Sequence, residues 1–147
     1  MLTKTHLALG LGIALYFLPH VNDKLIFFVV LMASSILPDL GTIISKDNRK
    51  IFSFPGSKSL YKIAHSYTIC IPLSIAVAIL YPVLALPFFL GYSFHLSLEV
   101  FTTEGIQPFW PSKKKSTGPI SPGGKIDQTI FYLFVIFDLA LLIKLFI

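Results

Sequence analysis

The chain has 147 residues, of which 54% are hydrophobic and 13% are charged, and its mean hydropathy is +0.78. A soluble domain carries about 25% charged residues, so this composition excludes an ordinary soluble domain and predicts an integral membrane protein. The length suits a single domain, a small transmembrane helix bundle over residues 1–147. The single cysteine, Cys70, excludes an internal disulfide and a zinc site built from several cysteines.

Five apolar segments, separated by turn and charge signals, predict an all-α polytopic bundle of about five transmembrane helices. The predicted spans are residues 3–19, 24–44, 66–82, 84–103 and 126–147. We interpret the first as a retained span, because it lacks a small-residue cleavage pattern and continues into the second apolar segment. The third and fourth spans are joined by a corner at residues 81–87, where Pro82 and Pro87 predict a tight helical hairpin.

The distribution of basic residues predicts the orientation in the membrane. Ten of the twelve lysines and arginines lie at the N-terminal end of the first span or in two long loops, 45–65 and 104–125: Lys4, Lys46, Arg49, Lys50, Lys58, Lys62, Lys113, Lys114, Lys115 and Lys125. Only Lys24 and Lys144 fall on or near the other side. The positive-inside rule therefore places the N-terminus and both loops in the cytoplasm and the C-terminus outside. With charge distributed in this way, we expect membrane lipids as partners and no nucleic acid.

His95 and Glu99 lie four residues apart in the fourth predicted span. Four residues make about one helical turn, so the two side chains share a face with about 5–6 Å between their Cβ atoms. An ionisable residue at membrane depth is costly and is by default a candidate for function. The pair therefore points to a site.

The predicted topology brings three more residues to the same cytoplasmic level. His6 begins the first span, Asp39 lies near the end of the second, and His65 opens the third. His20 lies at the opposite end of the first span and serves as an internal control. Three imidazoles and two carboxylates can hold one ion with an open position, or two ions. We expect a divalent metal, zinc first, with manganese or iron as alternatives.

Each of these residues also has a structural explanation. A histidine at a helix end, such as His6 or His65, can cap the helix or lie wet at the interface. Asp39 follows Pro38 and precedes Gly41, as a turn residue often does. A bonded imidazole and carboxyl can also pack between helices. The convergence at one level favours the metal site.

Several motifs follow one another along almost the whole chain. They are His6, Pro38-Asp39 after an apolar run, His65-Ser66 opening a helix, and a block from Gly91-Tyr92-Ser93-Phe94-His95 through Glu99, Thr102 and Gly105-Ile106 to Phe109-Trp110-Pro111. In order and spacing they resemble the YdjM-like family of predicted membrane-bound metal-dependent hydrolases. The resemblance implies a protein integral to the inner (plasma) membrane of a prokaryote. It also implies that the metal ligands are His6, Asp39, His65, His95 and Glu99.

Within this resemblance, Glu99 stands where the family usually has aspartate, and Thr102 stands at the family's threonine. The chain departs from the family at two places. After Asp39 it has Leu40-Gly41-Thr42 where the family often has x-Asp-His, and the family's histidine upstream of His65 is absent. The departures argue against two metal ions. They leave open a relative that keeps the fold with weakened or lost activity.

The predicted chemistry is metal-dependent hydrolysis, in which the ion acts as a Lewis acid and lowers the pKa of bound water toward about 7. Glu99 is expected to be either a ligand or the general base. Thr102, about two turns beyond His95 on the same face, is expected to orient water or substrate. Ser66 lacks a Gly-x-Ser-x-Gly elbow and is not predicted as a nucleophile. With Lys62 nearby at head-group level, we expect a phosphoester or lipid-linked ester as substrate.

Two other functional classes remain open at this point. Asp138, near the middle of the fifth span, would suit a small ion-coupled or proton-coupled transporter, or a protonated carboxyl bonded inside the bundle. A non-catalytic membrane scaffold would explain the departures from the family pattern. Glu104 and Asp127, near predicted interfaces, are expected to be solvated or paired with lysines. Prolines and glycines in residues 111–125 predict a flexible loop.

Overall fold

The computed structural model describes residues 1–40 and 57–147. Within these ranges the prediction of an all-α fold is confirmed, with six α-helices and no strand. The helices are α1 (Thr3–Phe17), α2 (Lys24–Ile36), α4 (Ser57–Ala64), α5 (Tyr67–Leu80), α6 (Pro82–Val100) and α7 (Lys125–Phe146). Two 3₁₀ turns, η1 (Leu18–His20) and η2 (Leu37–Asp39), extend α1 and α2.

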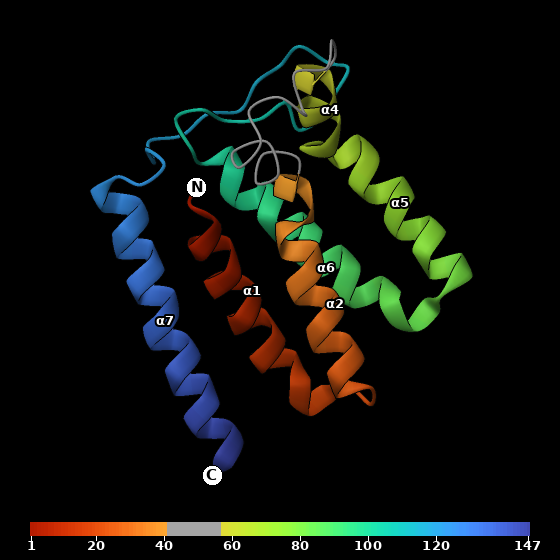
Figure 1. Ribbon diagram of the computed structural model, residues 1–147, viewed down its shortest axis with the longest axis vertical. Helices are drawn as coiled ribbons and strands as arrows, with labels where there is room; N and C mark the ends of the chain where they lie inside the picture. Colours follow the sequence, from red (N-terminus) through yellow and green to blue (C-terminus); the bar gives the residue numbers. More distant parts are fainter. Residues whose placement is uncertain (41–56) are drawn as a thin grey trace.

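Apart from the short α4, successive helices run in opposite directions (Figure 1). α1, α5 and α7 begin at the end that holds α4, and α2 and α6 return to it. The two termini lie at opposite ends. The main packing partners are α2 with α6, α1 with α7, and α5 with α6. This topology gathers the start of α1, the end of α2, the start of α5 and the end of α6 at one end.

Two of the helices, Pro82–Val100 and Lys125–Leu145, are long and apolar enough to cross a membrane, and Tyr67–Leu80 is apolar but shorter. α5 and α6 form the predicted hairpin, with Tyr81 between them and Pro82 at the first position of α6. Proline suits that position because its missing N–H has no intrahelical partner there.

Part of the predicted loop 45–65 is a helix instead, since α4 occupies residues 57–64. Its polar, lysine-bearing sequence lacks the long apolar run used to predict helices in this chain. The end of the predicted second span, residues 41–44, lies outside the described residues. So do the predicted loop positions Lys46, Arg49 and Lys50.

Small residues allow α2 and α6 to approach closely. A Cβ added at Gly91 of α6 would lie 2.5 Å from the Leu31 carbonyl oxygen of α2. The Ser34 hydroxyl also lies in this interface. It can donate to the Leu31 carbonyl oxygen at 3.0 Å or to the Pro87 carbonyl oxygen at 3.2 Å. Without a hydrophobic driving force between helices in lipid, such close packing and interhelical bonds stabilise a bundle. They set the register of α6 on α2.

The segment between α6 and α7, which includes the loop predicted to be flexible, is tied together by backbone hydrogen bonds. Ile106 and Ser116 bond each other in both directions, with N···O distances of 3.1 and 2.9 Å, and the Gly118 N–H donates to the Thr102 carbonyl at 2.9 Å. Gly105 takes φ +60°, which favours glycine. The segment runs across the end of the bundle at which α6 ends (Figure 1).

Ser66 fastens this segment to the start of α5. Its hydroxyl donates to the Pro108 carbonyl at 2.9 Å and accepts from the Trp110 N–H at 3.0 Å. It also accepts from the Thr68 N–H at 3.2 Å, as the N-cap of α5. The hydroxyl is therefore engaged in structural bonds.

Asp127 is fully buried, so the expectation that it is solvated or paired with lysines is wrong. One carboxylate oxygen accepts from the Thr5 hydroxyl at 2.8 Å, and the other accepts from the N–H groups of Leu2 and Gly123 at 3.0 and 2.8 Å. The first N–H groups of a helix have no intrahelical partner, and Leu2 offers no side-chain cap to α1. Asp127, at the start of α7, thus fastens the start of α1 through Leu2 and Thr5, close to His6.

Replacing Asp127 with alanine would leave the buried Thr5 hydroxyl and the N–H groups of the half-buried Leu2 and Gly123 without their acceptor. We expect Asp127→Ala to lower the free energy of unfolding by about 3 kcal/mol. The Tm of the detergent-purified protein should fall by roughly 5–10 °C. Thermal unfolding followed by circular dichroism measures this change.

Asp23→Ala is the matched control, because Asp23 precedes α2, is exposed and makes no side-chain cap bond. Its Tm should stay within about 2 °C of the native value. Equal losses in the two variants would contradict the structural role assigned to Asp127.

Candidate metal centre

The structure brings the five predicted ligand residues to one end of the bundle. His6 lies near the start of α1, Asp39 ends η2, His65 lies between α4 and α5, and His95 and Glu99 lie on α6. All are buried except Asp39, which is half-buried. Their roles as ligands remain predictions.

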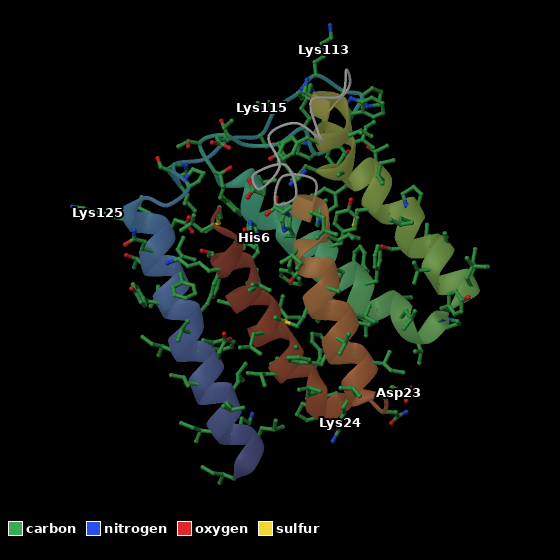
Figure 2. The ribbon with its side chains drawn as sticks, in the orientation of Figure 1. His6, Asp23, Lys24, Lys113, Lys115 and Lys125 are labelled. Atoms are coloured by element: carbon green, nitrogen blue, oxygen red, sulfur yellow. The ribbon has the colours of Figure 1, made fainter. Side chains whose placement is uncertain are left out.

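This end also carries lysines. Figure 2 shows His6 toward the end at which Lys113, Lys115 and Lys125 lie, and Asp23 and Lys24 at the opposite end. The site and the described basic residues of the segment before α7 therefore share one end of the molecule.

His6, Asp39 and His95 form a group that could hold a metal ion. One ligand atom from each lies within 4.8 Å of the others. The His95 Nε2 is 3.8 Å from the Asp39 Oδ1. The rings of His6 and His95 stack, with centroids 4.0 Å apart and planes inclined by 20°. Two imidazoles and a carboxylate are the ligand types that zinc and similar divalent metals take.

His65 lies against the same group. Its Nε2 is 3.3 Å from the Asp39 Oδ1 and 3.4 Å from the His95 Nε2. Tetrahedral ligands about 2.0–2.1 Å from a zinc ion lie roughly 3.3–3.4 Å from one another. Two of the three distances among these atoms match this spacing, and the third, from the His95 Nε2 to the Asp39 Oδ1, is 3.8 Å, so the three atoms lie close enough to ligate one ion.

Backbone carbonyls orient two of the imidazoles. The His95 Nδ1 donates to the Ser35 carbonyl at 2.7 Å, and the His65 Nδ1 donates to the Tyr61 carbonyl at 3.0 Å. A neutral imidazole carries one N–H, so in this tautomer the Nε2 of each ring has a lone pair. The two lone pairs and the Asp39 carboxylate then converge as acceptors. A cation among them would relieve their repulsion, and a carbonyl on the second ring nitrogen is typical of metal-binding histidines.

His6 offers a further acceptor. Its Nε2 lies 3.0 Å from the Glu99 Oε1, and since a carboxylate accepts, the N–H is on Nε2 and the lone pair on Nδ1. That Nδ1 is buried and has no hydrogen-bond partner among residues 1–40 and 57–147. A buried acceptor without a donor is costly. The set of metal-ligating atoms thus fits a divalent ion.

Glu99 and Thr102 lie beside the histidines in a supporting arrangement. The Glu99 Oε1 also contacts the amino group of Met1. The buried Thr102 hydroxyl donates to the Glu99 carbonyl at 2.8 Å and accepts from the Gly105 N–H at 2.9 Å, and it lies 3.4 Å from the Glu99 Oε2. Thr102 therefore connects the end of α6 to the segment that covers it.

Tyr61 was not predicted as a site residue. Its ring stacks on His65 with centroids 4.0 Å apart, and its carbonyl accepts from that ring. Burial, followed by the negative charges of Glu99, Asp39 and Glu104, raises the pKa of Tyr61 well above its usual range. The phenol therefore stays protonated. The signal that could have found it is its spacing, one helical turn before His65.

A pocket of about 230 Å³ adjoins the site at His65. Its lining comes from α4 and from the segment after α6: Tyr61, Lys62, His65, Gly105, Ile106, Gln107 and Lys115. The pocket opens beside the histidine whose Nε2 belongs to the cluster.

Two other residues from the sequence analysis lie away from this cluster. His20 is exposed in η1, at the opposite end of α1. Asp138 is 5% exposed in α7, and a Cβ added at Gly12 of α1 would lie 2.6 Å from its Oδ1. Within the described part of the chain, neither carboxylate oxygen of Asp138 has a hydrogen-bond partner.

A comparison with protein families gives one match, to a model described as YdjM inner membrane protein, over residues 1–145. No curated protein and no solved structure matches the chain.

Proposed function

The chain belongs to the family of YdjM inner membrane proteins, and from this premise we propose that it is a metal-dependent hydrolase with a single-metal site at the cytoplasmic face of the membrane. The observation that supports the proposal most directly is the convergence of the Asp39, His65 and His95 acceptor atoms, 3.3–3.8 Å apart. Burying such a group at the end of a membrane helix costs free energy. Its presence there therefore favours a functional site.

In this proposal, His6, Asp39, His65 and His95 hold one divalent ion, zinc first, with manganese or iron as alternatives. The ion, when bound, supplies Lewis acidity that activates water and polarises a phosphoryl or carbonyl oxygen. The family pattern has further ligands near Asp39 and His65 that this chain lacks. The ligands that remain suit one ion.

Glu99 is better suited to supporting the site than to binding the ion directly, because its Oε1 holds the N–H of His6. That bond keeps the tautomer in which the His6 Nδ1 can ligate. Its second oxygen, Oε2, lies 3.4 Å from the Thr102 hydroxyl. We assign Glu99 the proton-accepting role, with Thr102 positioning it.

The proposed topology has α1, α2, α5, α6 and α7 as five membrane spans of one domain, with the N-terminus in the cytoplasm and the C-terminus outside. Lys113, Lys115 and Lys125 at the His6 end (Figure 2) support a cytoplasmic location for that end. At about 1.5 Å per residue, the 15 residues of α1 reach roughly 22 Å. Its 3₁₀ extension and local thinning of the bilayer would accommodate the shortfall.

A location at head-group level suggests the substrate class, a phosphoester or a lipid-linked ester. Lys62 and Lys115 line the pocket beside His65, and lysine binds phosphate as a point charge. Membrane lipids are the proposed neighbours and a source of substrate.

The metal site can be tested by elemental analysis of protein purified in detergent under metal-replete conditions. We expect near-stoichiometric metal in the native chain and loss of it in His95→Ala, which removes a ligand. Glu99→Ala should weaken the metal affinity by about 10–100-fold, since it frees His6.

His20→Ala is the control, because His20 is exposed at the far end of α1; it should retain the metal. The proposal fails if the native chain holds no metal or if His95→Ala holds as much as the native chain.

One observation favours a second candidate function, a small proton-coupled or ion-coupled transporter. Asp138 is buried in α7 without a hydrogen-bond partner among the described residues. A transporter predicts proton or ion flux in liposomes that Asp138→Asn abolishes. The hydrolase predicts no such flux and an unchanged metal content in Asp138→Asn. A non-catalytic scaffold predicts neither metal nor flux.

The topology can be tested by cysteine labelling in a Cys70→Ser background, which removes the native thiol. A membrane-impermeant maleimide added to spheroplasts should label Lys144→Cys and should label Lys113→Cys only after permeabilisation. Both positions are exposed, so accessibility within the fold does not separate them. The reverse pattern would overturn the proposed orientation.

A further inference from the structure

The pocket beside His65 has the character of an anion-binding site. Lys62 on α4 and Lys115 on the segment after α6 approach it from different parts of the chain, and both are exposed. Among residues 1–40 and 57–147, no acidic residue lines the pocket, and its remaining walls include Tyr61 and Ile106. Two lysines that meet at one pocket suit a ligand that carries more than one negative charge.

The negative charges next to the pocket would make its affinity for an anion depend on a metal ion bound at the cluster. Asp39 and Glu99 lie in the cluster next to His65. Without a cation their carboxylates repel an anion, whereas a divalent ion would neutralise their two negative charges. An anion in the pocket would then be attracted by the lysines without that repulsion.

The size of the pocket limits what enters it. Pockets that bury a drug-sized ligand measure roughly 300–1,000 Å³, and this pocket is smaller, at about 230 Å³. Its volume suits a phosphate group with a small alcohol. A lipid substrate would place its head group here and leave its chains in the membrane.

We propose that Lys62 and Lys115 form the subsite for the phosphate of a phosphomonoester substrate at the metal centre. The inference rests on the proposed function. In the hydrolysis, water oxygen bonds to phosphorus, the ester P–O bond breaks, and the proton lost by water ends on the departing alcohol oxygen. The products are phosphate and an alcohol. Lys62 and Lys115 determine specificity by their positive charges and their positions at the pocket, and Tyr61 forms one wall of the pocket.

The first test measures binding of inorganic phosphate, the expected product, to the detergent-purified, zinc-loaded chain by isothermal titration calorimetry. Lys62→Ala combined with Lys115→Ala should weaken the affinity by about tenfold. Lys113→Ala combined with Lys114→Ala is the matched control. It removes the same charge at exposed positions that do not line the pocket and should change the affinity by less than about twofold at physiological salt.

Equal weakening by the two pairs, or none by the pocket pair, would overturn the inference. Metal content is measured on the same samples and should be unchanged in both pairs. A native chain without metal overturns the proposed function, whereas a metal-loaded chain whose phosphate affinity ignores Lys62 and Lys115 overturns only this subsite. Matching Tm values for the two pairs show that folding is not the cause.

The second test separates the two sources of a phosphomonoester by phosphate release. One arm uses phosphatidylcholine vesicles that contain phosphatidic acid, and the other uses glycerol 3-phosphate in solution. Release in the vesicle arm assigns the subsite to a lipid head group, and release in the soluble arm assigns it to a free phosphomonoester. Release in neither arm by the metal-loaded native chain overturns the substrate class.

Discussion

The close approach of α2 and α6 is the constraint on which the cluster depends. Gly91 has no Cβ to push against the Leu31 carbonyl, so the two backbones meet. At that distance the His95 Nδ1 reaches the Ser35 carbonyl at 2.7 Å, which sets the tautomer and aims the Nε2. Asp39 follows on the same chain segment, about one turn after Ser35. One interhelical register therefore places both residues, and a bulkier side chain at Gly91 would disturb them together.

The polar residues at this end are held mainly by bonds to the backbone. His65 donates to the Tyr61 carbonyl, and Thr102 bonds the Glu99 carbonyl and the Gly105 N–H. Ser66 likewise bonds backbone groups of the segment after α6. Backbone partners cannot be lost by a side-chain change alone, so the rings keep their orientation. The arrangement presents lone pairs inward, which suits a cation better than packing between helices.

The sequence could predict the five longer helices, though not α4, and the gathering of the cluster at one end, because both follow from apolar runs and from where charges fall along the chain. It could not predict how His95 and Glu99 divide their partners. They share a face of α6, yet His95 bonds the Ser35 carbonyl while Glu99 bonds His6. Asp127 was misjudged for a related reason: its partners include Thr5, 122 residues earlier in the chain. Contacts between distant helices depend on packing angles that periodicity does not contain.

The two acids of α7 show how the position of a carboxylate along the bundle determines which hydrogen-bond partners it finds. Asp127 accepts from the Leu2 N–H and the Thr5 hydroxyl at the start of α1, whereas Asp138 meets the middle of α1 at Gly12, where the helix uses its own N–H groups. Among the described helices, α1 contacts both the cluster, through His6, and Asp138, through Gly12. The position of α1 therefore determines both the place of His6 in the cluster and the close approach of Gly12 to Asp138.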